Sequence, residues 1–170
     1  MQSAFALITS VALLFAAACG GPSAQQVRTA KLAEYNAETG QLLDLSMQVA
    51  QRSYRIDPGD IDPNGRFRTS PQWYSAEGMR RGTSNQGNGD YLVNSMGGDI
   101  RLSLEVQVVA GPGGRSQVVV IPHTLQMVAG SPQPRPLAPD DPNMPGWVKG
   151  RVDKLAVDIH GAAQQYVQKP

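Results

Sequence analysis

Two neighbouring segments with β patterns constrain this chain most strongly. In residues 99–110, DIRLSLEVQVVA, apolar and polar residues alternate over ten positions, which is typical of a strand with one buried and one solvated face. The sequence GPGG at 111–114 then leads into a second β-rich run, RSQVVVIPHTLQMVA, at 115–129. The two runs predict a long antiparallel hairpin. Pro122 is expected at a bulge or an edge, because proline has no N–H for the ladder.

Helical patterns flank the hairpin on both sides. Apolar residues at helical spacing predict a first core helix over about residues 39–53, with Asn36 or Thr39 as its cap. Six prolines in residues 131–145 predict an extended arm without helix or sheet. A second apolar stripe predicts a terminal helix that closes the core; its residues are Val148, Val152, Leu155, Ile159, Ala162 and Tyr166.

This order of elements predicts the fold class. We expect a single α+β domain in which an antiparallel sheet with a long hairpin packs one face against an N-terminal and a C-terminal helix. About 150 residues are enough for one domain that buries roughly two-thirds of its unfolded surface. The net charge of +1 gives no field that would attract nucleic acid, so we expect no nucleic-acid partner.

The N-terminal segment has the character of a targeting signal. No charged residue precedes Arg28, and most of positions 4–19 are apolar or small. An apolar run of about 15 residues is too short to span a bilayer, which needs roughly 20, but suits a secretory signal. The only cysteine, Cys19, follows this run in the sequence AAACGG.

The sequence around Cys19 resembles the lipobox of bacterial lipoproteins, in which the cysteine is lipidated and becomes the mature N-terminus. The resemblance implies a signal peptide at 1–18, a lipidated Cys19 with a tether at 19–35, and an α+β domain at 36–170. Gly20 after the cysteine implies sorting to the outer membrane, with the protein facing the periplasm. If Cys19 is lipidated, the mature chain has no disulfide, and a hydrophobic core must stabilise it.

A second resemblance concerns the fold. The pattern of residues 35–69, YNAETGQLLDLSMQVAQRSYRIDPGDIDPNGRFRT, resembles the opening of helix-grip domains in small envelope lipoproteins, including lipoprotein subunits of the outer-membrane β-barrel assembly machinery. In those domains an initial helix leads into a strand, a turn and another strand. The resemblance implies a fold and gives little information on function.

No local motif predicts a catalytic or metal site. His123 and His160 have no His, Cys or carboxylate at metal-binding spacing. We expect His160 to be solvated and His123 to be a structural or surface residue, not a general base. The sequence DIDPNG at 60–65 matches the first half of a calcium loop, with oxygens from Asp60, Asp62 and Asn64. The position of the bidentate glutamate is Pro71, so a polar turn is favoured. We expect no cofactor.

Three aromatic residues are candidates for partner binding. These are Trp73, Tyr74 and Trp147, for which core packing is the alternative. The sequence favours a lipid-anchored, non-enzymatic interaction or scaffold protein of the cell envelope, held at the membrane by its N-terminal lipid and possessing an envelope protein partner. An alternative is a carrier that holds an apolar ligand between helix and sheet. A hydrolase with a site assembled from distant residues is less favoured.

Overall fold

The computed structural model describes residues 21–82 and 97–167. Cys19 and the predicted signal peptide at 1–18 lie outside the described residues, so the lipid anchor stays a prediction. Within the described ranges, no helix combines the length and the apolar character needed to cross a membrane.

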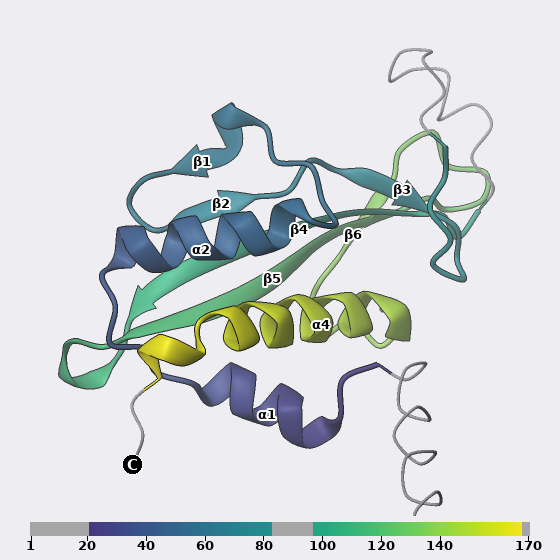
Figure 1. The fold of residues 1–170 in the computed structure, drawn as a ribbon. Helices are drawn as coiled ribbons and strands as arrows, with labels where there is room; N and C mark the ends of the chain where they lie inside the picture. The colour runs from purple at the N-terminus through teal and green to yellow at the C-terminus, as the bar shows by residue number, and fades with distance from the viewer. Residues whose placement is uncertain (1–20, 83–96, 168–170) are drawn as a thin grey trace, which may run out of the picture.

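The strands form one antiparallel sheet around the predicted hairpin (Figure 1). Strands β4 (Ile100–Ala110) and β5 (Ser116–Gln126) pair over their full length, which confirms the hairpin. Strands β2 and β3 both pair with β4, β1 pairs with β2, and β6 pairs with β5. These four strands are short: β1 (Ile61–Asp62), β2 (Arg66–Arg68), β3 (Gln72–Tyr74) and β6 (Arg135–Leu137).

Two helices lie on the same side of this sheet (Figure 1). They are α2 (Thr39–Gln51) and α4 (Gly146–Ala162). Both present an apolar stripe to the face of β4 that carries Ile100, Leu104 and Val106. The side chains that meet there are fully buried and include Leu42, Ile100, Leu104, Val106, Val148 and Ile159. The prediction of a single α+β domain with a sheet packed against two helices is confirmed.

The ends of α2 and α4 differ slightly from the prediction. The residue that caps α2 is Glu38, whose side chain makes no capping bond, so the predicted cap at Asn36 or Thr39 is wrong. The predicted stripe of α4 is buried up to Ile159, whereas Ala162 and Tyr166 pack on the core only in part. The helix ends there because the chain tightens into a 3-10 turn at Gln164–Tyr166.

A further helix occupies part of the expected tether. Helix α1 (Ala24–Leu32) begins with a capping box, in which the Ser23 hydroxyl accepts from the Gln26 backbone N–H and the Gln26 side chain accepts from the Ser23 N–H. The helix packs against α4, and Lys31 pairs with Asp153 at 2.6 Å. Helix α1 therefore lies within residues 19–35, which the sequence had assigned to a tether, and packs on the domain.

The proline-rich arm also differs from the prediction. We expected no sheet in residues 131–145, but Arg135–Leu137 pairs with β5 as strand β6. The buried Leu137 packs into the core, and its carbonyl accepts a hydrogen bond from the Thr124 hydroxyl at 2.9 Å. The strand can contain Pro136 because β6 lies at the edge of the sheet, where a missing N–H breaks no ladder bond.

Pro122 lies in β5 with its nitrogen turned to the outer edge. Opposite it, the backbone of Leu104 bonds to Thr69 and not to β5: Thr69 N donates to Leu104 O, and Leu104 N donates to Thr69 Oγ1, both at 2.9 Å. In an antiparallel pair the bonding direction alternates along the strand, so Pro122 also faces away from β4. Strand β6 pairs with β5 only from Thr124 onward. The edge position expected for Pro122 is confirmed.

Candidate binding surface

The face of the sheet opposite α2 and α4 is the candidate binding surface, here called the open face. In the part of the chain that the structure describes, no helix packs on it (Figure 1). Alternation places Arg101, Ser103 and Glu105 of β4 on this face, beside His123 of β5. The strand register sets these side chains next to Arg68 of β2, which pairs with Glu105.

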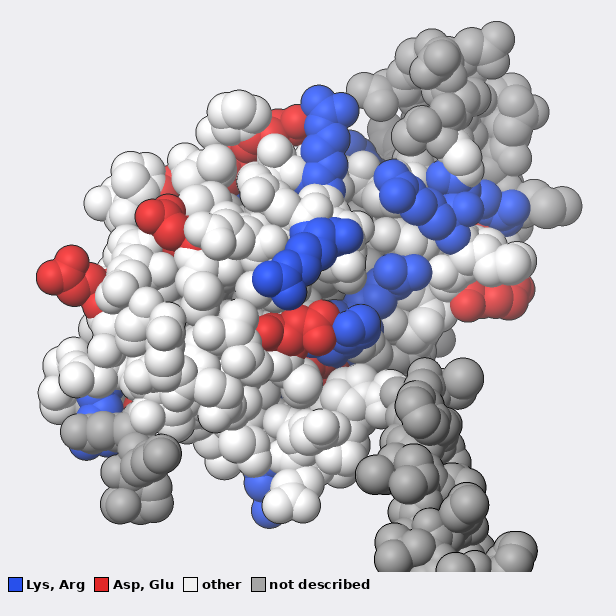
Figure 2. Space-filling model, in the orientation of Figure 1, with Lys and Arg blue, Asp and Glu red and all other residues white. Residues whose placement is uncertain are grey.

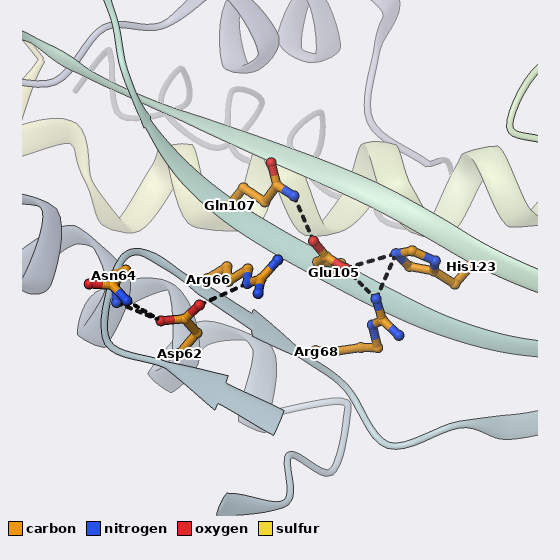
Figure 3. A network of polar contacts seen from close by, with 7 residues as sticks. All are labelled: Asp62, Asn64, Arg66, Arg68, Glu105, Gln107 and His123. Carbon is orange, nitrogen blue, oxygen red and sulfur yellow. Dashed lines mark hydrogen bonds and ion pairs between the residues drawn. The ribbon is translucent and has the colours of Figure 1, made fainter. Parts of the chain in front are cut away.

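A network of charged side chains joins three strands on the open face (Figure 3). The Glu105 carboxylate accepts from Arg68 Nη2 at 2.6 Å and lies 2.9 Å from His123 Nε2. Its other oxygen accepts from Gln107 Nε2 at 2.6 Å. Arg68 Nη2 also lies 3.3 Å from His123 Nε2. Glu105 is the centre of the network and is only 9% exposed, whereas Arg68 and His123 are nearly half exposed.

The environment keeps the Glu105 carboxylate ionised. Burial raises its pKa, but hydrogen bonds from Arg68, Gln107 and His123 and the charge of Arg68 outweigh burial, and the pKa falls to about 2. A carboxylate with so low a pKa is a weak base at neutral pH, where a general base works best with a pKa near the operating pH. Glu105 therefore suits the positioning of Arg68 and His123 better than the role of a general base.

The sequence analysis missed this network. It looked for carboxylates at metal-binding spacing along the sequence, whereas the carboxylate beside His123 is Glu105, which lies next to it across the hairpin. The two residues are 18 positions apart, and only the hairpin register brings them together: Ser103 pairs with His123, and Glu105 with Ile121. Counting outward from the turn at 111–114 would have placed them as diagonal neighbours.

Two pockets lie on either side of the network. A pocket of about 430 Å³ lies over β5 and β6, and its walls include Arg68, Arg101 and His123. A smaller pocket of about 220 Å³ lies over β1 and β2 and is lined by Asp62 and Glu105 among others. Neither pocket is lined by the fully buried core residues Leu42, Leu104 or Ile159.

The calcium-like sequence forms a polar turn. Asp62 Oδ1 accepts from the backbone and side-chain nitrogens of Asn64, both at 2.9 Å, and Asp62 Oδ2 accepts from Arg66 Nε at 3.0 Å (Figure 3). These bonds lower the pKa of Asp62, the backbone bond from Asn64 most of all. Asp60 ends a short 3-10 turn beside it. Among the described residues, no group of three or more His, Cys, Asp or Glu is placed to hold a metal.

The three aromatic candidates separate onto the two faces of the sheet. Tyr74 and Trp147 lie on the helix-covered side with ring centroids 5.2 Å apart, and the Arg151 guanidinium lies 4.4 Å above the Tyr74 ring. Trp147 Nε1 donates to the carbonyl of Ala76 at 2.9 Å. Trp73, paired with Arg101, is on the open face. The structure thus brings together two of the three candidates and places the third on the open face.

The Tyr74–Trp147–Arg151 group has the features of a packing cluster. Tyr74 is buried, and burial raises its pKa. Gly78, with φ of +87°, lies against Trp147 so closely that an added Cβ would stand 2.7 Å from the indole ring. Figure 2 shows that Lys and Arg gather on the half of the helix-covered side that carries β3. The rings of Tyr74 and Trp147 already contact each other and Arg151.

His160 is also better connected than the sequence suggested. We expected it to be solvated, but it is partly buried and its Nδ1 lies 3.0 Å from Tyr35 Oη, with Gln164 Nε2 2.7 Å from its Nε2. Burial lowers the pKa of His160 and raises that of Tyr35 to about 12. The backbone of Tyr35 also forms β-bridges to Ser116 and to Val167. Tyr35 therefore connects the segment before α2 with β5 and with the C-terminal end of the described chain.

Comparison with known proteins adds no relative: no protein-family model, no curated protein and no solved structure matches this chain. The function is therefore argued from the residues and their geometry.

Proposed function

We propose that the protein is a lipid-anchored, non-enzymatic interaction module of the bacterial cell envelope. It is held on the periplasmic side of the outer membrane through Cys19, and it binds an envelope component with its open face. The single observation that carries the proposal is that α2 and α4 cover one face of the sheet while the other keeps an ordered charged network without a covering helix in the described chain.

The start of the ordered domain supports a short connection to the anchor. Three residues separate Cys19 from Ser23, the residue that caps α1. The four Cα–Cα steps from Cys19 to Ser23 span at most about 14 Å in an extended chain. A lipid on Cys19 would therefore hold the domain close to the bilayer and raise its effective concentration near membrane partners without any further contact.

The low pKa of Glu105 supports binding over catalysis. The carboxylate fixes Arg68 and His123 through short hydrogen bonds, and charge-assisted bonds of this kind hold donors in place before a ligand arrives. The carrier alternative has less support, because the described core residues between the helices and the sheet include Leu42, Leu104 and Ile159, which are fully buried and line none of the described pockets.

Two measurements test the proposal. The intact mass of protein from its native host should show acylated Cys19 as the first residue; a mature form that begins after Cys19 would remove the anchor. A photo-crosslinking residue at Val119, which is 40% exposed on the open face, should then capture an envelope component in intact cells. The matched control is Leu32, which is 70% exposed on α1; equal capture at both positions would contradict the assignment to the open face.

A further inference from the structure

The pocket of about 430 Å³ on the open face has an unusual balance of charge. Two arginines and a histidine, Arg68, Arg101 and His123, line it, and none of the described residues in its wall is acidic. The pocket of about 220 Å³ on the other side of the network is different, because Asp60, Asp62 and Glu105 offset its arginines there. The larger pocket is therefore the one with an excess of positive charge, and its size lies within the range of small-ligand sites.

Two polar side chains in this pocket have unused hydrogen-bonding capacity. Arg101 is partly buried, and its guanidinium makes no hydrogen bond or ion pair to any residue in the described ranges. The Ser103 hydroxyl, on a residue only 7% exposed, likewise bonds to none of the residues that the structure describes. A guanidinium offers five N–H donors in a planar fork that matches a carboxylate or phosphate. An anion would supply the acceptors that both residues lack.

The remaining walls of the pocket are mostly apolar and stiff. They include Pro71, Pro122, Pro136, Pro139, Ile121 and Leu125. Walls of this kind match an apolar body attached to the anionic group. They also disfavour a peptide added as an extra strand, because Pro122 turns its nitrogen to this edge of β5 and has no N–H to offer the ladder. The ligand is therefore held through side chains.

We infer that this pocket binds a small organic anion in which a carboxylate or phosphate group is joined to an apolar body. The anionic group lies against Arg101 and Ser103, and the apolar body lies on the proline and Leu125 surface. Arg68, whose Nη2 donates to Glu105, also lines the pocket and adds a second positive charge to it. The inference rests on the proposed function in one respect, the use of the open face as the binding surface.

The experiment uses the full chain with Cys19→Ser, so that no acyl chain competes for the pocket. Octanoate and octyl phosphate are titrated by calorimetry, with octanol as the uncharged control and acetate as the control without an apolar body. We expect either octyl anion to bind at least tenfold more tightly than octanol or acetate, since charged hydrogen bonds in a partly dry site exceed neutral ones. Equal binding of octanol, or stronger binding of a Glu-rich peptide, would overturn the inference.

Matched variants locate the site. Arg101→Gln should weaken octanoate binding by about tenfold or more, and Ser103→Ala should weaken it by a smaller factor. Arg66→Gln is the control, because Arg66 lies on the same face, lines only the smaller pocket and pairs with Asp62. Unchanged affinity in Arg101→Gln with native circular dichroism would overturn the inference, as would equal losses in Arg101→Gln and Arg66→Gln.

The outcome is separable from that of the proposed function. Binding of octanoate with no acylation of Cys19 in the native host would remove the anchor and keep the pocket. Crosslinks at Val119 with no binding of any octyl anion would keep the interaction module and overturn the pocket ligand.

Discussion

The two faces of the sheet are built from the same strands but are stabilised by different interactions. On the covered face, Leu104 and Val106 are fully buried against α2 and α4, and stability comes from apolar area removed from water. On the open face, Val119 and His123 are 40% or more exposed, and order comes from hydrogen bonds around Glu105. Strand β4 thus contributes even-numbered residues such as Leu104 to the core and odd-numbered residues such as Glu105 to the polar network.

The comparison teaches that exposure and order are separate properties here. Arg68 and His123 are accessible to solvent, yet Glu105 fixes both at hydrogen-bonding distance. A charged pair at a surface contributes little to stability, about 0–1 kcal/mol. A buried carboxylate with several donors contributes more because its loss leaves those donors unpaired. The open face is therefore preorganised at the point where Glu105 is buried.

The largest expected effect comes from a core substitution on the covered face. Leu104→Ala should lower the free energy of unfolding by about 3 kcal/mol, because it removes buried methyl groups and leaves a cavity. The control Val119→Ala, on the open face, should change it by less than about 1 kcal/mol. Urea denaturation followed by circular dichroism measures both. Similar losses in the two variants would mean that the two faces do not differ as described.

The next prediction tests how much the buried charge of Glu105 on the open face contributes to the free energy of unfolding. Glu105→Gln should lower the free energy of unfolding by about 2 kcal/mol at neutral pH, the scale of a hydrogen bond to a charged group. The pKa of Glu105 is lowered from 4.5 to about 2, so its stabilisation is present above pH 4.5 and is lost as the pH falls toward 2.

Acid titration of stability checks this assignment. The wild-type protein should lose stability more steeply than Glu105→Gln between pH 4.5 and 2. Parallel curves for the two proteins would show that Glu105 is not the group responsible.

An effect of similar size is expected at Gly78, which lies against the Tyr74–Trp147–Arg151 cluster on the covered face. Gly78→Ala should lower the free energy of unfolding by about 2 kcal/mol, because Gly78 has a φ of +87° and its added Cβ would meet Trp147. Gly113→Ala is the control, since Gly113 has a φ of +71° but nothing within 4 Å of an added Cβ. It should cost about 1 kcal/mol from backbone strain alone. Thermal unfolding gives both values; equal shifts would mean that the Trp147 contact is loose.

The smallest effect is local to α1, which packs mainly against α4. Ser23→Ala removes the hydroxyl that accepts from the Gln26 backbone N–H, one of the two hydrogen bonds of the capping box. It should destabilise α1 by about 1 kcal/mol. Hydrogen exchange of the α1 amides should accelerate several-fold, while exchange in β4 and β5 stays unchanged. Faster exchange throughout the sheet would instead show that α1 is an integral part of the core.

The hairpin and the two core helices could be predicted because their patterns are long. Ten alternating positions leave one register for β4 and β5, and the stripe from Val148 to Ile159 repeats over several turns. Helix α1 was missed because it is short and mostly polar, although Ser23 and Gln26 spell a capping box. Strand β6 was missed because proline in Arg135–Leu137 argues against a strand, and only its place at the sheet edge permits one.

The binding surface was predicted less well than the fold, for a physical reason. Its residues come from β2, β4 and β5, and nothing local in the sequence distinguishes Arg68 or His123 from other exposed side chains. Trp73 was selected for its chemistry and does lie on the open face, but Tyr74, its neighbour, points to the opposite side. Neighbouring residues in a strand point to opposite faces of the sheet. Trp73 and Tyr74, which were chosen because they are adjacent in the sequence, therefore cannot belong to one site on one face.

Pro122 and Pro136 have a consequence for contacts between copies of the protein, which the proposed anchor would concentrate at one bilayer. Pro122 turns its nitrogen outward from β5, and Pro136, opposite Leu125 in β6, does so from the last strand of the sheet. An incoming strand would find acceptors but missing donors at both positions, and the ladder would not propagate. The same prolines that line the pocket thus disfavour edge-to-edge pairing of two molecules at the β5–β6 edge of the sheet.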